Sequence, residues 1–197
     1  MKVYDIIIVG AGPAGGNLTR RLAQKGYKVL TFDKEKELGE PIYSTAVTPD
    51  ETFRNFDLNL SLAHQAMNSW VLYGPNSKAE FKYDRPICYT LNLRQFKQEL
   101  IKQAIENSAE ILVDTEVIEP IIRDGIIVGV KYKGLGGEEE AFEKMIVDAS
   151  GHSGTLATQL KLRDQTPERL LVGLEYLMEN LDLPENGQKL ELYFDYK

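Results

Sequence analysis

The sequence predicts an α/β fold built on a parallel sheet, and three observations support this prediction. The run "VYDIIIVG" at residues 3–10 is short and almost wholly apolar, as is typical of a parallel strand buried on both faces. A helical stretch then leads into a second apolar run, "YKVLTFD" at residues 27–33, which completes a β-α-β unit with parallel strands. Several further strand-like runs lie in series between residues 110 and 149. The 197 residues are enough for one or two such domains.

The first helix is expected over residues 13–26, "PAGGNLTRRLAQKG". Pro13 suits the first helical turn, where a missing N–H costs nothing, and Gly26 suits the C-terminal cap. Ala14, Leu18 and Leu22 are spaced four apart, so they form one stripe of this helix.

The middle of the chain is expected to be more irregular. Residues 34–62 are polar and interrupted by prolines, which indicates a long loop with a short helical piece, and residues 66–90 contain two or three strand-like runs. The strongest helix pattern is "NLRQFKQELIKQAIEN" at residues 92–107. One face of this helix is formed by Leu93, Phe96, Leu100 and Ala104, with Ile101 and Ile105 beside it.

Two hairpins are expected in the strand-rich region that follows. Asp124-Gly125 predicts a tight hairpin, and "GLGG" at residues 134–137 predicts a looser one. Two more strand candidates, "LLVGLEYLM" at 170–178 and "KLELYFDY" at 189–196, come near the end of the sequence.

The composition excludes several classes of function. A net charge of −7 without any cluster of Lys and Arg argues against a nucleic-acid partner, because phosphate binding needs clustered cations. The single cysteine, Cys88, excludes an internal disulfide and is expected to be a small core residue. No His, Cys and carboxylate cluster has metal-ligand spacing, so no metal site is expected. With no apolar run near the roughly 20 residues of a membrane span, and no signal peptide, we expect a cytoplasmic protein.

A glycine-rich turn follows the first strand directly. Gly10, Gly12 and Gly15 form G-x-G-x-x-G, in which the first glycine makes the tight turn, the second lets a pyrophosphate approach, and the third allows close helix–strand packing. The N-terminus of the helix offers N–H groups and the positive end of its dipole to an anion. Asp33, at the end of the second strand, is placed to hold the hydroxyls of an adenosine ribose. This combination predicts a dinucleotide site; a plain tight turn is the alternative.

A second turn, "DASGHSG" at residues 148–154, allows two interpretations. It resembles the strand-to-helix turn of a hydrolase nucleophile, but Thr155 stands where that G-x-S-x-G motif needs its last glycine. No histidine follows Ser153, because the only histidines are His64 and His152. The sequence therefore favours a turn that faces a cofactor through Asp148 and Gly151, with an ordinary strand-end turn as the alternative.

Three segments together resemble a known group of enzymes. "YDIIIVGAGPAGGNLTRRLAQKGYKVLTFDK" resembles the opening of FAD-dependent oxidoreductases of the glutathione-reductase-like superfamily. "PICYTLNLRQFKQELIKQA" is similar to the segment in which these flavoproteins carry an arginine near a helix start, and "MIVDASGHSGTLATQLKL" is similar to their later Asp-x-x-Gly turn. The whole is most similar to the N-terminal half of the geranylgeranyl reductase family.

The resemblance implies an FAD/NAD(P)-binding Rossmann-like three-layer fold. It would have an antiparallel crossover sheet at about 115–143 and the start of an antiparallel substrate domain. We expect residues 1–65 and 91–162 to form the FAD-binding domain, and residues 66–90 and 163–197 to form part of the substrate-binding sheet.

The turns and the resemblance together give a set of candidate FAD-binding residues. Arg94 is included because a cation at the second position of a helix opposes the helix dipole, which is reasonable if an anion lies there; an exposed arginine without a ligand is the alternative. No catalytic acid or base is expected, since the flavin supplies the chemistry. The expected residues are Gly10, Ala11, Gly12, Pro13, Ala14, Gly15, Asp33, Lys34, Arg94, Val117, Asp148 and Gly151.

The function implied by the resemblance is flavin-dependent reduction of carbon–carbon double bonds in an isoprenoid lipid, with an unidentified electron donor and a peripheral membrane contact as a further option. An FAD-dependent aromatic hydroxylase or halogenase, and an FAD-binding fragment without turnover, are the alternatives. NAD in place of FAD is disfavoured by Arg94 and the later turn.

Two features depart from the family. Tyr43 and Ser44 stand where many of these reductases carry an Arg-Cys pair beside the flavin. Family members are also considerably longer, so the sequence is expected to be a fragment.

Overall fold

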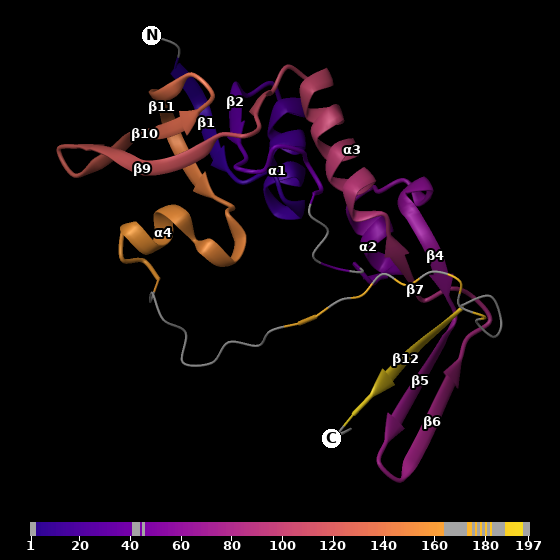
Figure 1. Cartoon of the computed structure of the whole chain (residues 1–197). Coiled ribbons are helices and arrows are strands. Elements are labelled where there is room, and N and C mark those ends of the chain that lie inside the picture. Colours follow the sequence, from indigo (N-terminus) through magenta and orange to yellow (C-terminus); the bar gives the residue numbers. More distant parts are fainter. Residues whose placement is uncertain are drawn as a thin grey trace. The chain divides into compact units, whose positions relative to one another are not determined.

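The computed structural model describes residues 3–40, 44, 46–163, 173–174, 176, 178, 180, 182 and 188–194. It divides into two compact units (Figure 1). Unit 1 contains Met1–Ile42 and Arg94–Val172, and unit 2 contains Tyr43–Leu93 and Gly173–Lys197. Residues 43–65, which we expected in the FAD-binding domain, fall in unit 2. Which ligand each unit binds stays a prediction.

Unit 1 is built around one six-stranded mixed sheet with the strand order β8-β2-β1-β11-β10-β9. The strands β8, β2, β1 and β11 are parallel, whereas β11, β10 and β9 are antiparallel. The expected crossover strands are therefore hydrogen-bonded to the parallel sheet through β11, because Phe142 pairs with Gly129 on one side and with Val3 on the other. The α/β fold class is confirmed. The strand bounds are β1 Val3–Val9, β2 Val29–Phe32, β8 Glu110–Leu112, β9 Glu116–Arg123, β10 Ile126–Gly134 and β11 Gly137–Asp148.

The first helix, α1 (Pro13–Gln24), buries a different face from the one that its leucines suggest. Ala14 is exposed and Leu18 and Leu22 are half-buried. The reason is the close approach of the helix to the first strand's turn: a Cβ at position 15 would lie 1.8 Å from the Gly10 carbonyl oxygen. Only small residues allow this approach. The buried residues of α1 are Gly15, Gly16, Thr19, Arg20 and Ala23.

The long helix α3 (Leu93–Glu106) buries the face that the sequence predicts, with one exception. Its buried residues are Leu93, Phe96, Leu100, Ile101 and Ala104. The exception is Ile105, which is 55% exposed because it lies at the margin of this face.

Both hairpins of unit 1 turn through two residues. Asp124 and Gly125 take positive φ angles of 50° and 77°, as expected for the tight hairpin. The second hairpin is also tight, because Gly134 pairs directly with Gly137 across the two residues between them. Our prediction of a looser hairpin there is wrong. Gly137 takes a φ of 102°, which the sequence gives no means of foreseeing.

Unit 2 contains two three-stranded sheets. One has the order β3-β7-β4 and is antiparallel, and the other has the order β12-β5-β6. In the second sheet β5 and β6 are antiparallel, but β12 is parallel to β5, so the expected all-antiparallel arrangement holds only in part. The candidate strand at 170–178 lies largely outside the described residues. The strands are β3 Thr48–Pro49, β4 Ala63–Met67, β5 Ser69–Gly74, β6 Ser77–Lys82, β7 Cys88–Leu91 and β12 Lys189–Tyr193.

We expected one short helical piece in the irregular region, and the described part of unit 2 has two before β4. These are α2 (Asp50–Asn55) and the 3₁₀ turn Leu60–Leu62. Cys88 is buried, and its sulfur accepts a hydrogen bond of 3.4 Å from the Trp70 indole nitrogen. It is therefore a core residue, as expected.

Glu143 in β11 is a buried acid in unit 1, 8% exposed, and neither of its carboxylate oxygens has a hydrogen-bond partner. Burial raises the pKa of Glu143 from 4.5 to about 7. Folding raises the pKa of this acid, so the unfolded chain ionises at a lower pH than the folded protein. The free energy of unfolding therefore falls as the pH rises from 4.5 through 7.

The substitution Glu143→Gln tests this pH dependence. Because the amide cannot ionise, we expect the variant to gain about 1–2 kcal/mol over the unsubstituted protein at pH 8, and much less at pH 5. Urea denaturation at the two pH values measures the difference. An equal difference at both values would show that ionisation of Glu143 is not the cause.

Candidate cofactor site

The carboxyl ends of three neighbouring parallel strands bring the predicted site residues together. The Gly10 N–H donates to the Phe32 carbonyl at 2.7 Å, and the Ala149 N–H donates to the Val9 carbonyl at 2.9 Å. The glycine turn after β1 therefore lies between Asp33, which follows β2, and the turn that follows β11. In open α/β sheets, ligands bind at this end of the strands.

The three glycines of the turn have different surroundings. A Cβ at Gly10, whose φ is 102°, would lie 2.5 Å from the Ala149 carbonyl oxygen, and a Cβ at Gly15 would lie 1.8 Å from the Gly10 carbonyl oxygen. A Cβ at Gly12 would meet nothing within 4 Å. The first and third glycines are thus required for packing, whereas the second leaves open space at the start of α1.

The start of α1 is open to an anion. Gly12 is the N-cap and supplies no side-chain hydrogen bond, and the first turn of α1 contains no acidic residue. The positive end of the helix dipole therefore faces the open space beside Gly12 with no acidic side chain in the first turn. Pro13 and Ala14 are both exposed at this end.

Asp33 connects the glycine turn to the end of β2. One carboxylate oxygen accepts a hydrogen bond from the Ala11 N–H at 2.7 Å, and the other accepts one from the Glu35 N–H at 2.9 Å. Each carboxylate oxygen has a second lone pair, so the group can still accept hydrogen bonds from a ligand's hydroxyl groups. The sequence predicted only the ligand contact; the bond to Ala11 adds a role in shaping the turn.

Asp148 organises the second turn through hydrogen bonds within the chain. One oxygen accepts from the Ser150 N–H at 3.1 Å and from the Ser150 hydroxyl. The other accepts from the Leu156 and Ala157 N–H groups, each at 2.8 Å, at the start of α4 (Thr155–Gln159). Burial works to raise the pKa of Asp148, but these hydrogen bonds outweigh it and lower the pKa below 3.8. Its carboxylate therefore fixes the shape of the turn.

The rest of this turn gives no support to a hydrolase. The Ser153 hydroxyl donates to the Ser150 carbonyl at 2.8 Å. Gly151 takes a φ of 70° and is exposed, and a Cβ there would meet nothing within 4 Å. The turn thus lies next to Gly10 and is exposed at Gly151, and its contact with a cofactor stays a prediction.

Asp148→Ala should remove the hydrogen bonds that hold α4 to the end of β11. We expect a loss of about 1–3 kcal/mol in the free energy of unfolding at pH 7. Because the pKa of Asp148 is lowered by folding, its contribution is present above pH 3.8 and is lost as the pH falls through the folded-state pKa. Urea denaturation at neutral and acidic pH measures both effects; unchanged stability at neutral pH would contradict this role.

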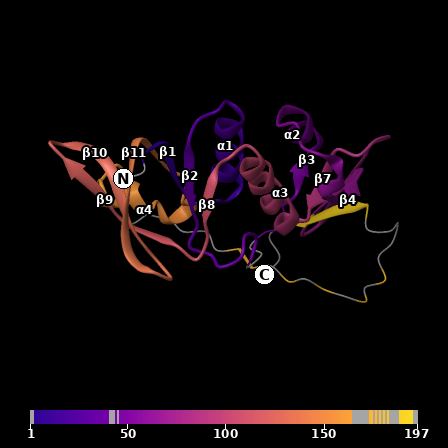
Figure 2. The ribbon, with the colours of Figure 1, turned by 90° about the horizontal axis from the view of Figure 1, so that it is seen from above.

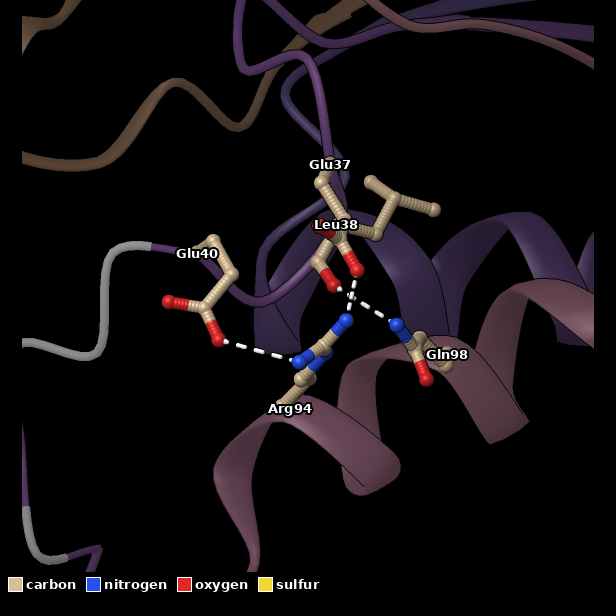
Figure 3. A network of polar contacts seen from close by, with 5 residues as sticks. All are labelled: Glu37, Leu38, Glu40, Arg94 and Gln98. Carbon is tan, nitrogen blue, oxygen red and sulfur yellow. Dashed lines mark hydrogen bonds and ion pairs between the residues drawn. The ribbon is translucent and has the colours of Figure 1, made fainter.

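Arg94, the second residue of α3, contacts the segment that follows β2 (Figure 3). Its guanidinium donates a hydrogen bond to the Glu37 carboxylate and lies 3.5 Å from an oxygen of Glu40. The same segment approaches the helix closely at Gly39, whose φ is 95°; a Cβ there would lie 2.5 Å from the Arg94 Cα. These two carboxylates were missed by the sequence analysis, since residues 34–62 have no periodic pattern.

The packing of α3 against α1 places Arg94 at the end of unit 1 that carries the glycine turn. A Cβ at Gly16 would lie 3.5 Å from the Leu100 Cβ, and the Arg20 guanidinium donates to the Gln103 side chain at 3.0 Å. These contacts show that the two helices run in the same direction, and Figures 1 and 2 both show them side by side. Along its helix axis Arg94 lies about 9 Å before Leu100, and Gly12 lies about 6 Å before Gly16. The N-termini of the two helices are therefore nearly level.

Lys34 and Val117 lie in different environments. Lys34 is exposed at the rim of a cavity of about 380 Å³. Val117 is 4% exposed as a whole residue and belongs to the hydrophobic core, so the structure gives it no exposed surface for a ligand. The other residues that line the cavity are Asp114, Glu116, Lys133, Gly134 and Leu135.

Three further predictions concern Tyr43 and Ser44, metal binding and membrane-spanning helices. Tyr43 lies outside the described residues, and the Ser44 hydroxyl accepts a hydrogen bond of 3.0 Å from the Ala46 N–H. Within the described part of the chain, no group of three or more His, Cys, Asp or Glu side chains is arranged to hold a metal ion. Among the same residues, no helix has the length and apolar character needed to cross a membrane.

The β-α-β unit, its glycine turn and the acid after β2 define a dinucleotide-binding domain of the Rossmann type. A profile of the pyridine nucleotide-disulphide oxidoreductase family matches residues 4–165. The chain belongs to this family.

Relatives and solved structures give the same picture. The chain is 36% identical over 187 residues to a digeranylgeranylglycerophospholipid reductase of Haloferax volcanii. The matched region covers 93% of this chain and 44% of that protein. A geranylgeranyl bacteriochlorophyll reductase-like protein from Thermoplasma acidophilum has a similar structure, with a TM-score of 0.74, 22% identity, and coverage of 80% of this chain and 42% of that one. The flavin-dependent brominase Bmp2 matches with a TM-score of 0.65 and 25% identity, over 77% of this chain and 39% of that one. The chain spans less than half the length of these proteins.

Proposed function

We propose that this chain carries the FAD-binding domain of a flavoprotein that reduces carbon–carbon double bonds of an isoprenoid lipid. The observation that supports this proposal most strongly is the meeting of three features at one edge of the sheet. These are the open helix start at Gly12, the carboxylate of Asp33 and the turn at Asp148–Gly151. The relatives' names supply the substrate class.

The described residues fit FAD. The space beside Gly12, where a Cβ would meet nothing within 4 Å, admits a diphosphate at the N-terminus of α1. Asp33 has acceptor capacity left for the adenosine ribose. Bound FAD supplies hydride transfer from its N5, while the protein's part is to bind and orient it. Lys34 remains a proposed contact to FAD, and Gly151 is proposed to lie near its ribityl or pyrophosphate region.

The substrate and the partners follow from the relatives and are part of the proposal. An isoprenoid lipid is the proposed substrate, and a reductant that delivers electrons to the flavin is required. Cytoplasmic localisation with a peripheral membrane contact suits a lipid substrate of this kind. The Arg-Cys pair of related reductases is replaced here by Tyr43 and Ser44. We therefore propose that this chain does not use a cysteine at that position.

An anaerobic turnover experiment tests the proposed reaction. The purified protein is loaded with FAD, reduced with dithionite and mixed with a geranylgeranyl-bearing glycerophospholipid. We expect the oxidised flavin absorbance to return as the lipid gains two hydrogens per reduced bond, which mass spectrometry detects. Bound flavin that the lipid never reoxidises would contradict the reductase function and support an FAD-binding fragment without turnover.

The structural similarity to a flavin-dependent brominase motivates one alternative, an FAD-dependent halogenase or hydroxylase. In those reactions reduced flavin reacts with oxygen, so the lipid would not reoxidise the flavin without air. The same experiment therefore separates the two functions, because only the reductase turns over anaerobically.

A further inference from the structure

We propose that Glu37 and Glu40 hold Arg94 by two ion pairs, and that the diphosphate of FAD takes their place when the cofactor binds. The two acids are then positioning residues that also weaken FAD binding, because each must give up its ion pair. This inference rests on the proposed function, since it concerns how the same site takes its cofactor.

The first step is charge. One guanidinium faces two carboxylates, so the Glu37–Arg94–Glu40 network has a net charge of −1. An anionic diphosphate gains little from a cation that two carboxylates already neutralise. For Arg94 to act on FAD, at least one of these carboxylates has to move away.

The second step is exposure. The side chains of Arg94, Glu37 and Glu40 are 44%, 52% and 40% exposed. Ion pairs this exposed contribute little, because water and salt screen them. Each carboxylate contacts Arg94 through one oxygen, whereas a phosphate can accept two parallel N–H bonds from the guanidinium and is then the stronger partner. Exchange of partners is favourable, and the carboxylates keep the guanidinium near the site until it occurs.

The third step is that the segment does not depend on these ion pairs for its position. The Gln98 side chain donates a hydrogen bond of 3.2 Å to the Leu38 carbonyl (Figure 3). Gly39 packs directly on the backbone of Arg94. Both contacts remain when the carboxylates release Arg94, so the backbone from Glu37 to Glu40 can stay on α3 while the side chains change partners.

The test is a double substitution, Glu37→Gln with Glu40→Gln, measured by titration calorimetry with FAD. We expect FAD to bind about threefold to tenfold more tightly than to the unsubstituted protein, because two exposed ion pairs no longer compete. Glu106→Gln is the matched control: it removes an exposed acid paired with Lys102 at the other end of α3, and should change the affinity by less than about twofold.

A second arm separates competition from general repulsion. In an Arg94→Gln background the two glutamate substitutions should no longer tighten binding, since no guanidinium is left to release. Equal tightening with and without Arg94 would overturn the proposal in favour of simple repulsion, and weaker binding in the double variant would overturn it directly. If the unsubstituted protein binds FAD but the double variant matches it, this inference alone fails. A folded protein that binds no FAD would remove the proposed function as well.

Discussion

Gly12→Ala is expected to weaken FAD binding by at least about a hundredfold while the protein remains folded, whereas Gly15→Ala is expected to destabilise the fold itself. The two substitutions add the same methyl group three residues apart. At Gly12 the new Cβ meets no protein atom within 4 Å, and it occupies the space through which a diphosphate would approach the helix. At Gly15 the new Cβ would lie 1.8 Å from a backbone oxygen.

The Gly15→Ala variant must separate α1 from β1, because neither the helix nor the carbonyl of Gly10 can move alone. We expect a loss of about 3 kcal/mol or more in the free energy of unfolding. Thermal denaturation of both variants without ligand, together with FAD titration, measures the contrast. Gly16→Ala is the control for the loss of a glycine in the same helix, because a Cβ there would lie no closer than 3.4 Å to its neighbours. A Gly12→Ala protein that binds FAD normally would show that no diphosphate lies there.

Asp33→Asn is expected to reduce FAD affinity by about tenfold to a hundredfold and to lower stability by about 1 kcal/mol. The amide keeps only one acceptor oxygen, so it cannot accept hydrogen bonds from the N–H groups of both Ala11 and Glu35. It also lacks the negative charge that strengthens hydrogen bonds from the ribose hydroxyls. Calorimetric titration with FAD and urea denaturation give the two values.

Asp5→Asn is the matched control for Asp33. Asp5 lies at the opposite end of the sheet, in β1, where its carboxylate accepts a hydrogen bond of 3.0 Å from the Lys28 N–H and pairs with Lys144. Loss of that carboxylate should affect stability slightly and leave FAD affinity unchanged. Equal losses of affinity in both variants would indicate a general effect of charge or stability.

The sequence could predict the parts of the fold in which local pattern and packing agree. The apolar run of β1 and the spacing of apolar residues in α3 correctly predicted elements that are buried. The choice of face in α1 could not be predicted from hydrophobicity, because the closeness of Gly15 to Gly10 depends on glycines that have no side chains to count. Strand partners were similarly hidden: β12 pairs in parallel with β5, which lies far from it in the sequence, so no local pattern indicates the pairing.

The candidate site shows the same division. The glycine turn and Asp33 could be predicted since their spacing is local and the turn follows a strand. The partners of Arg94 could not, because Glu37 and Glu40 lie in an irregular segment that the fold brings to the start of α3. Asp148 was predicted to lie in a turn beside a cofactor, which stays a prediction, and its hydrogen bonds to Leu156 and Ala157 could not be predicted because they depend on how α4 folds back.

Calorimetric titration of the unsubstituted protein with FAD, followed by the absorbance spectrum of the complex after gel filtration, tests most directly whether the glycine turn binds a flavin nucleotide. We expect saturation at one FAD per chain, with flavin absorbance retained through the column and lost in the Gly12→Ala variant. A folded protein that shows no binding heat and no retained flavin at about 50 μM FAD would contradict the assignment of this site.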